Sequence, residues 1–177
     1  MSLICAVWKK LAPPKVELMV WLALMGKLNT KDMLARKGVI SEDLNACTFC
    51  SEQAEDIHHL LVNCQVSWNL WKTIAGAFGQ ALEPCTDLKI LYGNWLMKSF
   101  PNKTVRKLWI TSFFAIVWSL WLHRNNMVFN QQQLDERELD QLVKWRVTFW
   151  SRAWEEHIPY SADMLARNFH SFPLLFS

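Results

Sequence analysis

Four residues in the first half of the chain have the types and the spacing to bind a metal ion. Cys47 and Cys50 are separated by two residues, His59 follows after eight more, and Cys64 after a further four. A two-residue gap allows both thiolates of one turn to face the same ion, and an imidazole and a third thiolate can complete a tetrahedron. Zinc suits this mixture of sulfur and nitrogen ligands. Because four protein ligands leave no open coordination position, the site is predicted to be structural.

The same residues have other interpretations. They could be ordinary buried thiols and a core histidine, or Cys47 and Cys50 could be a redox pair, although the strand–helix context of such pairs is missing. A hydrolase with a cysteine nucleophile is the least favoured, because zinc would occupy each of the three thiols. His58 competes with His59 as the ligand. Neighbouring helical residues point about 100° apart, so only one of the two should face the ion.

The segments that must position these residues are predicted to be helical. Apolar residues recur at helical spacing, and few segments have the alternation typical of strands. We therefore predict a mainly α protein: a small helical domain with one irregular Cys3His zinc knuckle, followed by long Trp-rich helices. Helices are expected at about residues 15–25, 31–37, 55–61, 67–78, 103–129 and 134–157. The predicted divisions are a zinc-binding domain (1–80), a connector (81–101), a Trp-rich helical region (102–157) and a poorly structured tail (158–177).

Composition narrows the class of protein. Of the 177 residues, 51% are hydrophobic and 20% charged, which excludes a disordered chain. The uncharged run at residues 108–122 is shorter than the roughly twenty residues of a membrane span, so a buried core helix and no membrane association are expected. No signal peptide is visible, and an intracellular, reducing location is expected, in the nucleus or the cytoplasm. Cys5 and Cys85 are predicted to be buried or free thiols.

The distribution of charge suggests where nucleic acid could bind. The net charge of +3 is too small to argue for such binding by itself, but residues 1–40 carry seven Lys and Arg against two Asp and Glu. The tryptophans at helical spacing are expected to be core residues rather than stacking platforms for bases; they are Trp68, Trp71, Trp118 and Trp121. The candidates for phosphate contacts are Lys9, Lys10, Lys15, Lys31, Arg36 and Lys37.

Several motifs together resemble a known family. Residues 8–15 read W-K-K-L-A-P-P-K, residues 30–38 read T-K-D-M-L-A-R-K-G, and a C-x-x-C and an H-L-x-x-x-C follow. This order is similar to the plant reverse-transcriptase zinc-binding domain, found near the C-terminal end of LINE-type (non-LTR) retroelement polyproteins. Because Leu60 follows His59, the resemblance selects His59 over His58 as the zinc ligand. Residues 116–129 resemble the W-x-x-W-x-x-R-N-x-x-x-F helix that follows this domain, in which Arg124 and Asn125 are expected to cap or tie down the helix end.

The resemblance implies a function without catalysis. The chain has no Asp-Asp dipeptide of the kind that holds Mg²⁺ in a polymerase, and no carboxylate set typical of a ribonuclease H. We therefore expect a detached zinc-binding fragment that is not an enzyme, has no small-molecule substrate, and associates with RNA, single-stranded DNA or other retroelement proteins. The alternatives are a helical protein–protein interaction module and a functionless retroelement remnant.

Overall fold

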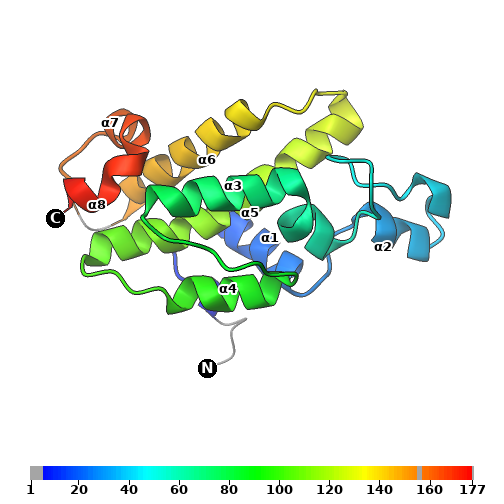
Figure 1. Ribbon diagram of the computed structural model, residues 1–177, viewed down its shortest axis with the longest axis horizontal. Coiled ribbons are helices and arrows are strands. Elements are labelled where there is room, and N and C mark those ends of the chain that lie inside the picture. The colour runs from blue at the N-terminus through cyan, green and yellow to red at the C-terminus, as the bar shows by residue number, and fades with distance from the viewer. Residues whose placement is uncertain (1–5, 155–156, 177) are drawn as a thin grey trace.

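The computed structural model describes residues 6–154 and 157–176, and these residues form an all-helical protein (Figure 1). Within the described residues the only β-like feature is one antiparallel bridge between Ala46 and Ala54. The mainly α prediction is therefore confirmed. The α-helices are α1 (Pro14–Leu24), α2 (Lys31–Arg36), α3 (Gln65–Ala77), α4 (Leu88–Met97), α5 (Lys103–Asn130), α6 (Glu136–Trp150), α7 (Ala162–Arg167) and α8 (Phe172–Leu175). The shorter turns are η2 (Glu42–Leu44), η3 (His59–Asn63), η4 (Ser151–Ala153) and η5 (Phe169–Ser171).

Side chains at the helix starts explain where several helices begin. Asp87, Asn102 and Asp135 each accept two backbone N–H groups from the first turn of α4, α5 and α6, respectively. Thr30 accepts one from Met33 at the start of α2. Such caps satisfy N–H groups that have no partner inside the helix. These four helix starts are therefore encoded locally in the sequence.

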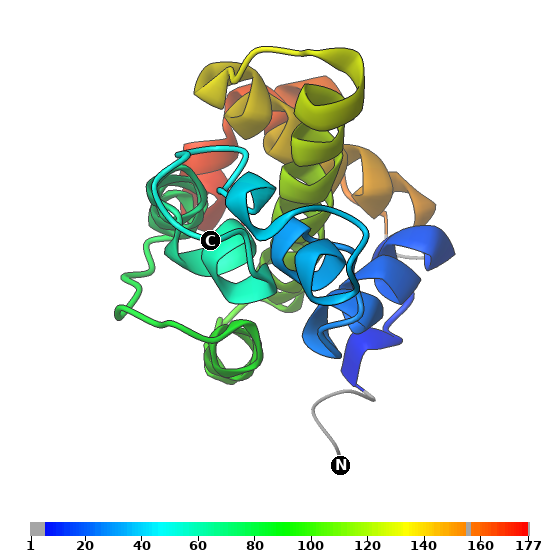
Figure 2. The ribbon, with the colours of Figure 1, turned by 90° about the vertical axis from the view of Figure 1, so that its right-hand side faces the viewer.

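Helix α5 is the centre of the molecule and packs against α1, α3, α4 and α6 (Figures 1 and 2). Its core contacts are largely aromatic. The rings of Trp95 on α4 and Trp109 on α5 stack with centroids 3.7 Å apart, and each indole Nε1 donates a 2.8 Å hydrogen bond to the other residue's carbonyl oxygen. Phe113 of α5 contacts Trp71 of α3 and Tyr92 of α4. These contacts hold three helices in one core.

Helix α5 is long and apolar enough to cross a membrane by length and composition alone. In the fold, however, 72% of its most apolar window is buried by the rest of the protein, as in the core helix of a globular domain. The prediction of a buried core helix at residues 108–122 is confirmed, since Leu108, Phe113 and Leu120 are completely buried.

Two segments contain more structure than the sequence predicts. The predicted connector, residues 81–101, contains helix α4, and the tail predicted to be poorly structured contains α7, η5 and α8. Phe169 and Phe172 from this tail are fully buried against Phe78 at the end of α3. Their burial offsets the conformational entropy that is lost when short helices become ordered. Residues from the predicted domain 1–80 and the predicted region 102–157 belong to one continuous core.

Candidate metal centre

A tight turn and a short antiparallel pairing position the first two cysteines. The backbone N–H of Cys47 donates to the carbonyl of Gln53 (2.7 Å), and that of Glu55 donates to the carbonyl of Asn45 (2.8 Å). Between these bonds the chain turns back, and the N–H of Ser51 donates to the carbonyl of Cys47 (2.8 Å). Ser51 has φ 58°, a left-handed conformation found at such turns. This knuckle directs Cys47 and Cys50 to the same side.

The other two predicted ligands lie at the ends of the π-helical turn η3. The N–H of Cys64 donates to the carbonyl of His59 (2.7 Å), which is the i to i+5 bond of a π-helix. This bond brings residues five positions apart onto the same side of the chain. The Asp56 carboxylate accepts the N–H groups of His58 and His59, both at 2.8 Å, and so fixes the start of the turn. The spacing of His59 and Cys64 thus matches the i to i+5 hydrogen bond of this turn.

The four predicted ligands come together in space. One ligand atom from each of Cys47, Cys50, His59 and Cys64 lies within 4.8 Å of all the others. The Sγ atoms of Cys47 and Cys64 are 4.0 Å apart, and Cys50 Sγ is 3.3 Å from His59 Nε2. A tetrahedral zinc ion with ordinary bond lengths holds its sulfurs about 3.8 Å apart and a sulfur and a nitrogen about 3.6 Å apart. The donor set and its spacing therefore fit zinc.

The surroundings of these side chains also fit a metal ion. Cys47, His59 and Cys64 are buried and Cys50 is half-buried, so the centre is largely shielded from water. A hydrogen bond to Cys64, together with burial, raises the pKa of Cys47, whereas the same hydrogen bond lowers the pKa of Cys64. Thiolates are the metal-binding form, so a cation bound here would displace the thiol protons.

His58 points away from the cysteines. Its Nδ1 accepts the backbone N–H of Leu88 (3.2 Å), and its Nε2 lies 3.7 Å from the Asp87 carboxylate at the start of α4. The structure thus places His59 and not His58 beside the thiols, which is the choice that the family resemblance implies. Cys85 is a free, half-buried thiol that donates to the carbonyl of Asp87. Cys5 lies outside the described residues.

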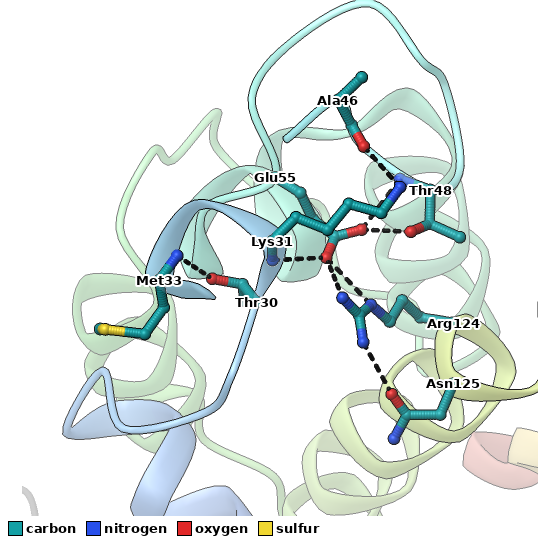
Figure 3. Close-up of polar contacts among 8 residues, drawn as sticks. All are labelled: Thr30, Lys31, Met33, Ala46, Thr48, Glu55, Arg124 and Asn125. Atoms are coloured by element: carbon teal, nitrogen blue, oxygen red, sulfur yellow. Dashed lines mark hydrogen bonds and ion pairs between the residues drawn. The ribbon is translucent and has the colours of Figure 1, made fainter. Parts of the chain in front are cut away.

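A buried ion pair beside the knuckle is not predicted by the sequence analysis. The Nε and Nη2 atoms of Arg124 on α5 donate to Oε1 of Glu55 at 2.9 and 2.6 Å (Figure 3). The same carboxylate accepts the backbone N–H of Lys31, and its Oε2 accepts both the N–H and the hydroxyl of Thr48. Burial raises the pKa of Glu55, but the hydrogen bonds from Arg124 and Thr48 lower it by more, so the pKa lies below its usual value.

The six basic residues predicted to contact phosphate do not form one free patch. Lys15 lies over the Trp118 ring, the Lys31 ammonium donates to the carbonyl of Ala46, Arg36 pairs with Asp32, and Lys37 donates to Asn29. These four contacts span 5.6, 2.9, 2.8 and 2.9 Å, respectively. Lys9 is half-buried before α1, and Lys10 is exposed there. Their role in binding stays a prediction.

The four tryptophans predicted to be core residues are core residues. Trp71 is fully buried, and the other three are partly buried against the core: Trp68, Trp118 and Trp121. The large exposed rings lie elsewhere. Trp145 and Phe149 on α6 stack on each other with centroids 4.6 Å apart and have 45% and 52% of their surface exposed. Phe149 and Lys10 line opposite parts of an apolar groove of about 430 Å³ between α6 and the start of α1.

Comparison with known proteins gives a match in the N-terminal part of the chain. Residues 1–71 match the family model described as zinc-binding in reverse transcriptase. The matched segment contains all four clustered side chains, whereas Arg124 lies outside it. A search of curated proteins and a search of solved structures found no match.

Proposed function

We propose that residues 1–71, as a reverse-transcriptase-type zinc-binding domain, hold one structural zinc ion through Cys47, Cys50, His59 and Cys64, and that the chain is not an enzyme. The observation that carries this proposal is the convergence of four ligand atoms within 4.8 Å. Three thiolates and one imidazole fill the coordination sphere of zinc, so no position is left for a substrate or an activated water. When bound, the ion cross-links the knuckle to the start of α3 and contributes free energy to folding.

The test is the zinc content of the purified chain. We expect about one zinc per chain, released by a strong chelator. Cys47→Ser and His59→Ala should abolish the bound zinc, because each removes a ligand. The matched controls are Cys85→Ser and His58→Ala, which change the same residue types outside the cluster and should retain it. Retention of zinc by His59→Ala together with its loss from His58→Ala would overturn the ligand assignment.

A second proposal is association with single-stranded nucleic acid, in particular RNA. It is supported by the description of the matched family and by the excess of basic residues at positions 1–40. One surface feature favours it: the exposed Trp145–Phe149 stack lies beside a groove that also contains the Lys10 side chain. Exposed rings bind bases by stacking and lysines bind phosphates, without a requirement for sequence. Both kinds of group are present at this groove.

Titration of a fluorescent single-stranded RNA at several salt concentrations tests the second proposal. Binding should weaken as salt rises, because lysine contacts release counterions. Trp145→Leu should weaken binding by about 1–3 kcal/mol through the loss of stacking, and Lys10→Glu should also weaken it. Lys72→Glu on α3 is the control at an exposed lysine away from the groove. Absence of binding at low salt, or affinity that does not change with salt, would favour a protein–protein interaction module instead.

A further inference from the structure

Resting on the proposed zinc site, we infer that Arg124 is a positioning residue of the metal centre. Arg124 lies on α5, outside the matched residues 1–71. Its hydrogen bonds go to Glu55 and Asn125 and not to any of the four predicted ligands. It acts through the Glu55 carboxylate on the turn that carries Cys47 and Cys50. The functional metal-binding unit then includes the C-terminal half of α5.

Glu55 fixes the knuckle through its contacts with Thr48. Its Oε2 accepts the backbone N–H of Thr48 at 2.9 Å and also the Thr48 hydroxyl (Figure 3). Thr48 directly follows Cys47 in the turn that carries two of the predicted ligands. The carboxylate therefore sets the orientation of the peptide from which the first sulfur projects.

Arg124, in turn, fixes Glu55. Both bonds from the guanidinium go to Oε1, which leaves Oε2 free to accept from Thr48. The Glu55 side chain is 0% exposed and the Arg124 side chain 3%, so water cannot replace the guanidinium without rearrangement. Arg124 is itself held by Asn125, whose Oδ1 accepts from Nη1 at 3.0 Å, and by the Trp121 ring, 5.3 Å away.

The same contact network also holds the residue that precedes Cys47. The N–H of Lys31 donates to Glu55 Oε1 (3.1 Å), while the Lys31 ammonium donates to the carbonyl of Ala46 (2.9 Å; Figure 3). Cys47 is thus placed between two anchored peptides, at Ala46 and at Thr48. Partners that orient metal ligands in this way typically change metal affinity about 10–100-fold when they are removed.

The experiment measures zinc affinity by competition with a chromophoric chelator, and the absorption spectrum of the Co²⁺-substituted protein. Arg124→Met should weaken zinc binding about 10–100-fold and alter the Co²⁺ bands that report ligand geometry. Arg124→Lys should recover part of the affinity because an ammonium can still donate to Glu55. Thr48→Val, which removes only the hydroxyl contact, should have a smaller effect. Arg106→Met on the exposed face of the same helix is the control and should match the wild type.

A double variant separates an effect on zinc affinity from a loss of folding. Glu55→Gln with Arg124→Met leaves no unpaired buried charge, so it should fold better than Arg124→Met alone while its zinc affinity stays low. If Arg124→Met and the double variant are less stable but keep wild-type zinc affinity and the wild-type Co²⁺ spectrum, the ion pair acts on stability alone and the inference is wrong. Failure of the wild-type chain to bind zinc would instead refute the proposed function, so the two failures are distinguishable.

Discussion

At the scale of single residues, His123 shows how burial tunes a titratable group. This imidazole on α5 is buried, its Nε2 has no hydrogen-bond partner among the described residues, and its ring lies 6.4 Å from that of Phe49 in the knuckle. Burial lowers the pKa of His123, while the nearby carboxylates of Glu138 and Asp135 raise it by less. The neutral form is therefore the one that the fold accommodates.

This shift predicts a pH dependence of stability. As pH falls below about 6.5, the unfolded chain gains a proton on His123 before the folded chain does. The free energy of unfolding should therefore decrease between about pH 7 and pH 5, by up to about 1.4 kcal/mol per pH unit from this one group. Urea unfolding of the wild type and of His123→Gln across this range measures the contribution. An equal pH dependence in the two proteins would show that His123 does not titrate in this way.

The metal ligands are predicted from the sequence more fully than the residues that orient them. The spacing of Cys47, Cys50, His59 and Cys64 carries the chemistry of a zinc site directly, and the family resemblance, through Leu60, selects His59 over His58. The contact between Glu55 and Arg124 leaves no such trace, because the two residues are 69 positions apart and no local pattern relates them. A pairing of this kind arises only when α5 docks against the knuckle.

At the scale of elements, the contact between α4 and α5 depends on two tryptophans that form reciprocal hydrogen bonds. Trp109 donates to the carbonyl of Trp95 near the end of α4, which also accepts a longer bond from the backbone N–H of Lys98 (3.4 Å). The reciprocal bond runs from Trp95 to the carbonyl of Trp109. Because both rings are buried, water cannot reach the indole N–H groups, and each of them depends on this hydrogen bond for a partner.

Substitution of Trp109 is predicted to be strongly destabilising. Trp109→Ala should lower the free energy of unfolding by about 3–5 kcal/mol through the cavity that it leaves. Trp109→Phe keeps a ring but loses the hydrogen bond, and should cost about 1–3 kcal/mol. Met97→Ala, at an 84% exposed side chain on α4, is the control and should stay within about 0.5 kcal/mol. Chemical denaturation measures all three, and similar midpoints for Trp109→Ala and Met97→Ala would contradict the assigned packing.

The C-terminal helices are predicted to contribute to stability although they are short. Phe169→Ala should cost about 3–5 kcal/mol, because its ring is fully buried against Phe78 and Phe172. Leu174→Ala, at a largely exposed side chain in α8, should have little effect. Thermal unfolding of the two variants compares them. A wild-type melting temperature for Phe169→Ala would mean that this tail does not pack on α3.

Helix prediction from the sequence succeeds where the apolar pattern is long. The expected helices at residues 15–25, 67–78 and 103–129 correspond to α1, α3 and α5, with small shifts at their ends. Helix α6 is shorter than the expected 134–157, because the chain leaves the helix at η4. The π-helical turn at His59 and the helices α4, α7 and α8 are not predicted as such. Tertiary packing, rather than a long apolar period, stabilises these elements.

At the scale of the whole molecule, the segment that carries the Cys3His cluster and the Trp-rich helices share one core. Buried residues from Ala6 to Phe172 form a single cluster, and the Glu55–Arg124 pair joins the knuckle to α5. The division into residues 1–80 and 102–157 stays a prediction about domains. The continuous core argues that the two parts unfold together, since neither can lose its packing without exposing the other.

Cooperative unfolding is therefore the expected behaviour of the zinc-loaded chain. Zinc release, near-ultraviolet circular dichroism and tryptophan fluorescence should change at the same denaturant concentration. Addition of a strong chelator should move all of the remaining signals to a lower midpoint together, because metal binding supplies folding free energy. Two separated transitions, with zinc lost in one and most of the aromatic signal in the other, would instead support two independent domains.

The central position of α5 also has a consequence for synthesis on the ribosome. Helix α6, which covers it on one side, ends about twenty residues after α5. At about 5–20 residues per second, the nascent polypeptide exposes this apolar helix for roughly 1–4 seconds before α6 is complete. During that interval the half-covered helix is a binding site for chaperones and a site of aggregation, which makes production of the protein sensitive to truncation or stalling after residue 130.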